Sequence, residues 1–431
     1  MRYDVIVVGS GAAGYYSAVS CAEKGMKTAV VEMEELGGTA FRWGSLAVKR
    51  VLDSFRRVDE DLLREAGIRP EEYYKKEYRR AVREMPQIEE KIDERLRKRG
   101  IDIYSGEAVI GGMEEGYRKV AMEGRSIYGK IIVLATGTTG KTLWRGEAIV
   151  THRELLGMED LPEKICIVGG SVEGIELATI TAYMGIETVV IEGEGEVLKG
   201  TERDLVVPVE EKLQRKGVRF LLGNRVEGCR QDSEGIEVRL DNGKILRTDL
   251  VVVTGMRNPN IPKGVEAETT EGFIKVDENY RTTTEGIYAV GDINGIMGMA
   301  NAARYQGEQM GNILGGKRGK SHPESLSRAI YTIPEIACTG FQGKMSGRGE
   351  FKDTFRGWSK EIAGGFIVVY SDDSETICGI SMSGEDVSEY LGALGYLVDR
   401  RVSLEEARGI MMAHPTMMEA FHDAVEDVIN N

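Results

Sequence analysis

The stretch DVIVVGSGAAGYYSAVSCAEKGMKTAVVEM, residues 4–33, decides the fold of this 431-residue chain. It opens on a short β-branched apolar run, Val5 to Val8, which predicts a strand buried on both faces. Glycines in GxGxxG spacing follow, then a helical segment, then a second short strand that ends in an acid. These are Gly9, Gly11 and Gly14, the helix 14–24, the strand 28–31 and Glu32.

This βαβ unit predicts a dinucleotide site. The glycines let the backbone turn tightly and approach a pyrophosphate, and the helix N-terminus presents unpaired N–H groups to the phosphates. The carboxylate of Glu32 would accept hydrogen bonds from a ribose diol. Strand, helix, strand and acid together are far more specific than the glycine spacing alone.

A second copy of the unit begins at Lys164, in KICIVGGSVEGIELATITAYMGIETVVIE. Gly169 and Gly174 keep the outer glycine positions, whereas Ser171 replaces the middle glycine. The second strand ends at Glu192, an acid that suits a free ribose 2′-hydroxyl and therefore favours NAD over NADP. Because serine is small, two readings stay open here, a working nucleotide site and a vestigial one.

Composition limits the class of protein. A chain of 431 residues predicts two or three domains. The net charge of -14 argues against nucleic acid or an anionic membrane surface as the main partner. No apolar run is long enough to span a bilayer, so we expect no stable membrane insertion. Five dispersed cysteines without a CxxC pair indicate reduced thiols, and four histidines argue against a His-rich metal site. We expect a cytoplasmic protein.

The remaining segments complete an α/β prediction. Residues 47–99 have the charge and apolar spacing of solvated helices over a sheet, and residues 101–110 and 130–134 read as strands. A later strand delivers Gly291 and Asp292 to its carboxyl end, where ligands bind in open α/β sheets. From residue 321 the pattern changes to an antiparallel sheet with helices, which predicts a third domain.

With these motifs in order, the chain resembles the class I pyridine nucleotide–disulfide oxidoreductases, and in pattern dihydrolipoamide dehydrogenase, over nearly its whole length. The resemblance implies the two-dinucleotide-binding fold of glutathione reductase, two Rossmann-like domains followed by an α+β interface domain. The implied domains are FAD-binding in 1–147 and 256–320, NAD-binding in 148–255, and interface or dimerisation in 321–431. It also implies a homodimer.

The resemblance assigns candidate site residues. Those implied for FAD are Gly9, Gly11, Gly14, Glu32, Gly38, Thr39, Lys49, Ala108, Thr136, Gly137, Gly291 and Asp292. Those implied for NAD are Gly169, Ser171, Gly174 and Glu192. The implied catalytic residues are Lys49 and Glu176, an ion pair beside the flavin, and His414 with Glu419, an acid–base pair that reaches the flavin of the other subunit.

One segment departs from the family pattern GGTCxNxGCxPSK. It reads LGGTAFRWGSLAVKR, residues 36–50, with Ala40 and Ser45 in place of both cysteines. In the family, these cysteines form the disulfide that relays electrons from the flavin, and only a thiolate can exchange with a disulfide substrate. Disulfide reduction by the family mechanism is therefore excluded, unless a cysteine distant in sequence folds close.

Three residue-level alternatives stay open. Glu419 either pairs with His414 or completes a capping box with Thr416 as N-cap. Arg42, beside Trp43, either binds an anionic acceptor or forms a structural ion pair. The methionines around His414 either pack in the core or form an adaptable apolar wall for a flat acceptor such as a quinone. These are Met411, Met412, Met417 and Met418.

Three functions remain. The first is an FAD oxidoreductase that passes electrons from NADH to a quinone, another small oxidant or a protein partner. The second is a flavin enzyme that acts directly on a bound substrate, with His414 as acid–base group and a lapsed nicotinamide site, which Ser171 and Glu173 favour. Transhydrogenation is a subcase, because WGS resembles the WGT of a transhydrogenase branch. The third is a non-catalytic flavin-binding homologue.

Overall fold

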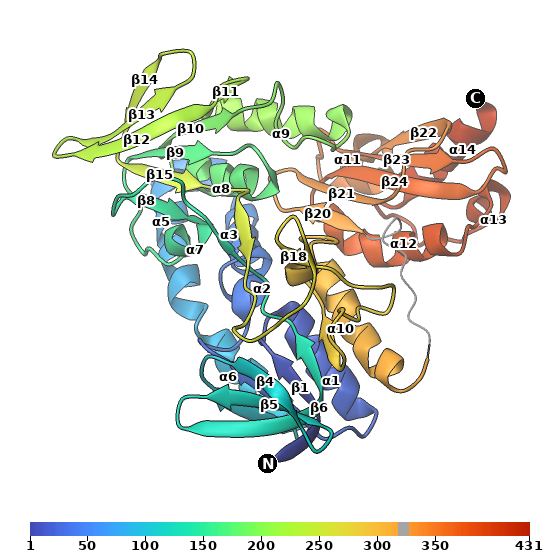
Figure 1. The fold of residues 1–431 in the computed structure, drawn as a ribbon. Coiled ribbons are helices and arrows are strands. Elements are labelled where there is room, and N and C mark those ends of the chain that lie inside the picture. Colours follow the sequence, from blue (N-terminus) through green and yellow to red (C-terminus); the bar gives the residue numbers. More distant parts are fainter. Residues whose placement is uncertain (318–326) are drawn as a thin grey trace. The chain divides into compact units, whose positions relative to one another are not determined.

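The computed structural model describes residues 1–317 and 327–431, and the chain forms two compact units (Figure 1). The first consists of Met1–Val51, Lys75–Leu161 and Leu250–Ser321, and the second of Leu52–Tyr74, Pro162–Asp249 and His322–Asn431. The predicted beginning of the interface domain, residues 321–326, lies outside the described residues. No helix in the described part of the chain has the length and apolar character that crossing a bilayer requires.

The first unit is built on a seven-stranded sheet of order β3-β2-β1-β6-β5-β4, with β19 also paired to β6. The pairs β1–β2, β1–β6, β2–β3 and β6–β19 are parallel, and β4–β5–β6 is antiparallel. The strands are β1 Arg2–Val8, β2 Thr28–Glu32, β3 Asp102–Ser105, β4 Val109–Glu114, β5 Tyr117–Met122, β6 Arg125–Leu134 and β19 Ile287–Ala289. The prediction of an α/β fold is confirmed.

Strand β1 is buried on both faces, as its apolar run predicts. Val5 and Val7 point into one core cluster with residues of α1 (Ala12–Glu23), whereas Ile6 and Val8 point into a second cluster on the other face. Successive side chains of a strand face opposite sides, so an unbroken apolar run needs a cover on each side. Helix α1 packs against α10 (Ala300–Leu314) on its face of the sheet (Figure 1).

The charged segment 47–99 is helical, as predicted. Its helices are α3 Ser45–Arg56, α4 Glu60–Glu65, α5 Pro70–Glu84 and α6 Gln87–Arg97, and a short α2, Gly38–Arg42, comes before them. Smaller elements complete the first unit. They are β7 Thr138–Gly140 paired with β16 Arg257–Pro259, β8 Ile149–Thr151 paired with β15 Leu250–Val253, β17 Thr269–Thr270 paired with β18 Phe273–Ile274, α7 His152–Leu155 and η1 Asp292–Asn294.

The prediction of one strand over residues 101–110 is wrong. The structure has two strands, β3 and β4, which pair with different neighbours, β2 and β5. Gly106, between them, has a φ of +141°, a conformation that a side chain would strain. The apolar pattern continues across this bend because both strands contribute buried side chains to the same sheet.

The second unit repeats the βαβ arrangement with β9 Lys164–Val168, α8 Val172–Tyr183 and β10 Glu187–Glu192. Both β9 and β11 (Arg219–Leu222) pair in parallel with β10, and α9 (Arg203–Arg215) comes before β11. An antiparallel sheet follows, made of β12 Val226–Asp232, β13 Gly235–Leu240 and β14 Ile245–Thr248. The internal duplication inferred from the sequence is therefore a structural repeat.

The C-terminal part of the second unit is an antiparallel sheet of order β20-β21-β24-β23-β22, as the alternation predicts. The strands are β20 Arg328–Ile330, β21 Glu335–Gly340, β22 Met345–Glu350, β23 Phe366–Ser371 and β24 Ile377–Gly384. The helical elements are η3 Phe351–Asp353, α11 Phe355–Ser359, η4 Val387–Tyr390, α12 Leu391–Asp399, α13 Leu404–Arg408 and α14 Glu419–Asn430. Helix α14 packs on β22 and β23.

We expect Gly349→Ala to destabilise the C-terminal sheet. A Cβ on Gly349 would lie 1.9 Å from the Ala420 carbonyl oxygen, so α14 would have to move away from β22. Overpacking of this kind costs about 1–3 kcal/mol. Gly112→Ala, in β4, is the matched control, because nothing lies within 4 Å of its Cβ position. Urea unfolding followed by circular dichroism compares the two, and equal stability would contradict the close packing.

Candidate functional site

The three glycines of the loop between β1 and α1 differ in how closely the surrounding backbone approaches them. Gly9 has a φ of +97°, and a Cβ there would lie 2.5 Å from the Ala135 carbonyl oxygen. A Cβ on Gly14 would lie 1.9 Å from the Gly9 carbonyl oxygen, so these two glycines are required by the protein itself. The Cβ position of Gly11 has no neighbour nearer than 4.0 Å. The protein leaves space at Gly11, which is where a pyrophosphate would approach the backbone.

The Glu32 carboxylate accepts hydrogen bonds from residues of this loop and of the segment after β2. Its Oε2 accepts hydrogen bonds from the Ser10 N–H at 2.8 Å and the Ser10 hydroxyl at 2.7 Å, and its Oε1 accepts from the Glu34 N–H at 3.1 Å. The Ser10 hydroxyl in turn accepts a hydrogen bond from the Gly37 N–H at 3.0 Å. A carboxylate oxygen has more than one lone pair, so Glu32 can hold the loop and still accept from a ribose hydroxyl.

The other residues predicted for FAD lie in the same unit. Gly38 begins α2, and a Cβ on it would lie 2.9 Å from the Cα of Gly11, so the two backbones are in close contact. Thr39 follows in α2, and Lys49 lies in α3. Ala108 is buried in the core cluster behind the sheet, which also contains Ile293 of η1.

The second group predicted for FAD follows strands β6 and β19. Thr136 and Gly137 leave β6, and the Thr136 hydroxyl donates to the Asn260 carbonyl oxygen at 2.6 Å. Gly291, after β19, has a φ of +79° and donates its N–H to Gln306 Oε1 at 2.7 Å. Asp292 begins η1 directly after this glycine.

Asp292 is part of a polar chain that the sequence did not reveal. The Thr138 hydroxyl donates to Asp292 Oδ2 at 3.4 Å, and Arg257 Nε donates to the Thr138 hydroxyl at 2.6 Å. Burial raises the pKa of Asp292, and the charge of Arg257 and the Thr138 hydroxyl oppose this rise. The signal that could have found Arg257 is its place just after a buried strand, in GMRNPN.

The second fingerprint reproduces the geometry of the first. Gly169 has a φ of +113°, and Gly174 is buried in α8. Glu192 Oε2 accepts from the Gly170 N–H at 2.6 Å, and its Oε1 accepts from the Glu194 N–H at 2.9 Å. Glu192 therefore holds its loop through the same two backbone positions as Glu32.

Ser171 differs from the glycine it replaces in one useful respect. It is the N-cap residue of α8, yet its side chain makes no capping hydrogen bond. Its hydroxyl oxygen is buried and, within the described residues, has no hydrogen-bond partner. Buried polar atoms are normally paired, so this hydroxyl at a helix N-terminus fits a bound phosphate group.

Glu176, on α8, is buried with 8% of its surface exposed. Its Oε1 accepts a hydrogen bond from the Tyr331 N–H at 2.8 Å. Burial raises the pKa of Glu176 to about 8, and the Tyr331 N–H works against that rise. Lys49, its predicted partner, belongs to the other compact unit, and their pairing stays a prediction.

His414 and Glu419 are in direct contact. His414 Nδ1 lies 2.6 Å from Glu419 Oε1, and this hydrogen bond lowers the pKa of Glu419. Glu419 Oε2 also accepts the Thr416 N–H at 3.2 Å, so one carboxylate serves both geometries weighed in the sequence. The other half of the capping box is not formed. Helix α14 begins at Glu419 with Met418 as N-cap and without a side-chain capping hydrogen bond, and the Thr416 hydroxyl donates to the Ala413 carbonyl oxygen.

Comparison with known families agrees with this geometry. A family model described as pyridine nucleotide-disulphide oxidoreductase matches residues 3–307, and the dimerisation-domain model of the same family matches residues 326–425. The chain belongs to the pyridine nucleotide-disulphide oxidoreductase family. Members of this family contain FAD and depend on NAD(H).

Curated relatives of this oxidoreductase include the dihydrolipoyl dehydrogenases of Chlorobaculum parvum and Bacillus subtilis. Each is 28% identical over 98% of this chain, covering 96% and 97% of the relative. Among solved structures, LpdA from Mycobacterium tuberculosis has a TM-score of 0.89 at 21% identity and covers 99% of both chains. The HOCl-induced flavoprotein disulfide reductase RclA from Escherichia coli has a TM-score of 0.85 at 19% identity, covering 98% of this chain and 99% of that one. These likenesses confirm the predicted fold.

The two positions that the resemblance assigns to the family's cysteines lie close together. Ala40 is in α2 and Ser45 begins α3, and the Ser45 hydroxyl is 3.5 Å from the Ala40 carbonyl oxygen. All five cysteines lie in the described residues and are free, and only Cys21 belongs to the first unit. Burial raises the pKa of every thiol, to about 12 for Cys21 and Cys166 and to about 11 for Cys229.

Arg42 of the oxidoreductase is engaged in ion pairs. Its Nη1 lies 3.2 Å from Glu89 Oε2 and its Nη2 lies 3.8 Å from Glu35 Oε2, with 13% of the side chain exposed. Its guanidinium also lies over the Trp43 ring, and Arg153 lies over the same ring at 4.3 Å from the centroid. These contacts favour a structural ion pair over a binding site for an anionic acceptor, because the Arg42 guanidinium is already paired with two carboxylates.

The methionines around His414 divide into two groups. Met412, Met417 and Met418 pack against the C-terminal core cluster, as the packing alternative holds. Met411 is 96% exposed. Met411 is therefore the most exposed of the four, and the other three are partly buried.

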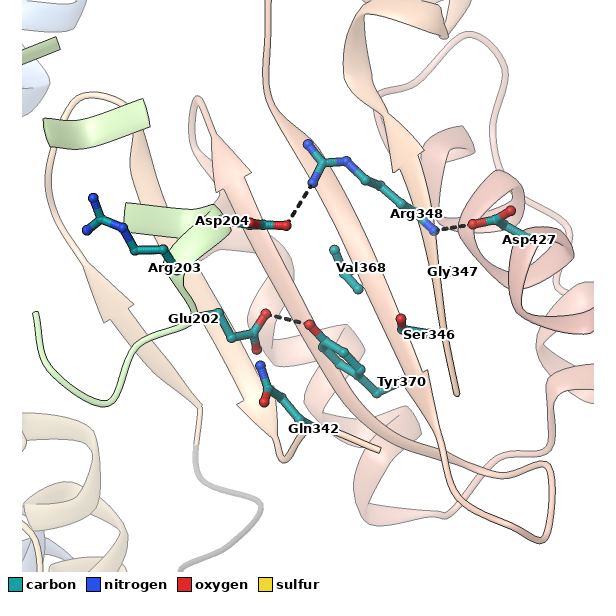
Figure 2. A pocket seen from close by; sticks show the side chains of 10 residues that line it. All are labelled: Glu202, Arg203, Asp204, Gln342, Ser346, Gly347, Arg348, Val368, Tyr370 and Asp427. Atoms are coloured by element: carbon teal, nitrogen blue, oxygen red, sulfur yellow. Dashed lines mark hydrogen bonds and ion pairs between the residues drawn. The ribbon is translucent and has the colours of Figure 1, made fainter. Parts of the chain in front are cut away.

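A pocket of about 350 Å³ lies in the second unit, and none of the predicted site residues is among those that line it. Figure 2 shows Tyr370 directed at Glu202 and the Arg348 side chain directed at Asp204, while Asp427 accepts the Arg348 N–H at 2.9 Å. The carboxylates of the pocket are thus paired within the protein. Among residues 1–317 and 327–431, no cluster of His, Cys, Asp and Glu is arranged to hold a metal ion.

We expect Glu176→Gln to change how the stability of the protein depends on pH. Between the ordinary carboxyl pKa of 4.5 and about 8, the folded chain keeps a proton on Glu176 that the unfolded chain has released. The free energy of unfolding of the wild type should therefore fall, relative to the variant, as pH rises through this window. Urea unfolding at a series of pH values measures it. The opposite slope would show that a cation holds Glu176 ionised.

Proposed function

We propose that this chain is an FAD-dependent oxidoreductase that takes electrons from NADH and passes them to an acceptor that is not a disulfide. A quinone, another small oxidant or a protein partner would serve as acceptor. One observation carries the proposal. The two positions of the family's redox cysteines hold Ala40 and Ser45, whereas both nucleotide fingerprints keep the geometry that nucleotide binding needs.

FAD, when bound, supplies the chemistry of accepting a hydride equivalent and releasing electrons to an oxidant. The chain's own residues would bind and orient it. Gly11 and the N-terminus of α1 would receive the pyrophosphate, and Glu32 would accept from the ribose. Asp292, backed by Thr138 and Arg257, is the carboxylate that the family resemblance assigns to the ribityl chain.

The second fingerprint would bind NADH through Glu192 and Ser171. The Ser171 hydroxyl is an unpaired donor at the start of α8, which suits a phosphate oxygen. Glu192 would accept from a ribose 2′-hydroxyl and would repel a 2′-phosphate. We therefore expect NADH to be preferred over NADPH. The domain boundaries inferred from the sequence, with NAD in residues 148–255, belong to this proposal.

His414 would move the proton that accompanies electron transfer to the acceptor. Because Nδ1 faces Glu419, the ring is held in one orientation and Nε2 is the atom left to exchange a proton. The match of the dimerisation-domain model to residues 326–425 supports a homodimer, in which His414 serves the flavin of the other subunit.

The state of the cysteines supports a non-disulfide acceptor. A thiol attacks a disulfide only as thiolate, and a pKa raised by burial keeps a thiol protonated at neutral pH. Cys21, the one cysteine in the unit of the first fingerprint, is 0% exposed and lies in the core cluster. Its environment offers no route for exchange with a substrate.

The test is an anaerobic titration of the purified protein with NADH and NADPH, followed by oxidation with quinones, lipoamide and dyes. We expect NADH to bleach the flavin absorbance, a quinone or dye to restore it, and lipoamide to have no effect. Alkylation of the thiols should not change these results. Reoxidation by lipoamide that alkylation abolishes would contradict the proposal.

A flavin that dithionite reduces and NADH does not would instead favour direct action on a bound substrate. Ser171, in place of the middle glycine, is the observation that keeps this second function open. Protein that binds no FAD at all would exclude both functions.

A further inference from the structure

The connection between β20 and β21 joins two buried carboxylates of the second unit. At its start, the Tyr331 N–H donates to Glu176 Oε1 at 2.8 Å. At its end, Glu335 begins β21 with 0% of its surface exposed. The first end of the loop is thus hydrogen-bonded to one buried carboxyl group, and the loop leads into a second, Glu335.

Arg56, the last residue of α3, holds this loop from the other side. Its Nη1 lies 2.6 Å from Glu335 Oε1, and its Nη2 donates to the Thr332 carbonyl oxygen at 2.8 Å. Only 9% of the Arg56 side chain is exposed. The planar guanidinium thus fixes two points of the loop at once, which a point charge would not do.

Two further hydrogen bonds leave the loop little freedom. The Ser388 N–H donates to Glu335 Oε2 at 3.0 Å, and the Thr332 hydroxyl donates to the Pro334 carbonyl oxygen. Thr332 is fully buried. The Thr332 carbonyl lies one residue after the Tyr331 N–H, so the contact with Arg56 restrains the backbone next to the group that donates to Glu176.

Stability alone does not account for such a pair. Desolvating two charges is costly, and apolar residues of similar size often replace a buried ion pair without loss of stability. The arrangement is consistent with a positioning role. The pair contacts the loop at Thr332 and Glu335, and Tyr331 of the same loop donates to Glu176.

We propose that the buried ion pair of Arg56 and Glu335 positions the Glu176 carboxyl group through the backbone of Tyr331 and Thr332. The two residues are thus positioning residues for the electron transfer from NADH, and the inference rests on the proposed function. Within the second unit, the charged groups that act on Glu176 are Glu173 of its own helix and Glu335 of β21, the latter balanced by Arg56.

The test replaces the pair by Arg56→Met and Glu335→Met together, so that no buried charge is left uncompensated. The matched control removes another ion pair of the same unit, Arg408 with Glu426, whose Nε and Oε1 lie 2.7 Å apart and which is more exposed. Each double variant is made with and without Glu176→Gln. Flavin reduction by NADH is followed anaerobically across pH, and urea unfolding is measured at the same pH values.

With the pair removed, we expect reduction by NADH to slow about tenfold or more, since small misplacements of active groups have effects of this order. Loss of the Tyr331 N–H contact raises the pKa of Glu176, whereas loss of the Glu335 charge lowers it. Because the hydrogen bond is the larger of the two effects, the inflection due to Glu176 should move to higher pH in both measurements. This shift should be absent in the Glu176→Gln background and in the Arg408 control. Arg56→Lys, which keeps the charge without the two-point contact, should show part of the same effect.

The inference is overturned if the folded double variant keeps the wild-type rate and pH profile, or if its changes are the same with and without Glu176→Gln. If the double variant does not fold, Arg56→Lys decides by the same criteria. A wild type whose flavin NADH does not reduce would refute the proposed function instead. The pH dependence of unfolding would still test the positioning.

Discussion

The hydrogen bonds that the Glu32 carboxylate accepts from Ser10 hold the backbone between β1 and α1 in the one arrangement the rest of the first unit depends on. The Ser10 hydroxyl also accepts a hydrogen bond from the Gly37 N–H, at the start of α2. The backbones of Gly38 and Gly11 are therefore in close contact. Two separate segments thus converge on one glycine whose Cβ position the protein leaves free. A buried parallel sheet supplies the rigid support, and the loop at its carboxyl edge supplies the binding surface.

The second fingerprint has the same hydrogen bond between acid and loop as the first, and it differs at the middle glycine position, which holds Ser171. Glu192 accepts the Gly170 N–H as Glu32 accepts the Ser10 N–H, so the acid, the loop and the helix have kept their mutual geometry. Ser171 replaces space with a buried hydroxyl that has no partner in the described residues. This hydroxyl narrows the place where a pyrophosphate would lie but also offers it a hydrogen bond. Binding of NADH to the isolated protein decides between a retained and a vestigial nucleotide site.

The fingerprints could be predicted because their physics is local. Strand burial, glycine spacing and the terminal acid all lie within about thirty residues of each other in a βαβ unit. His414 and Glu419 are five residues apart in the chain, and the resemblance implies their pairing. The prediction of one strand over residues 101–110 is wrong, because the pairing of β3 with β2 and of β4 with β5 depends on strands elsewhere in the sheet. The Arg257 chain and the Tyr331 contact join residues far apart in sequence, which a single sequence cannot pair.

We propose that the flavin is the only redox centre of this protein, because Ala40 and Ser45 cannot form a disulfide and the five cysteines are free. An anaerobic titration with dithionite, with electron uptake counted per bound FAD, tests this claim most directly. A disulfide is a two-electron couple, as is the flavin. The account predicts uptake of two electrons per FAD, without the long-wavelength absorbance of a thiolate beside the flavin. Uptake of four electrons per FAD would show a second two-electron centre and contradict it.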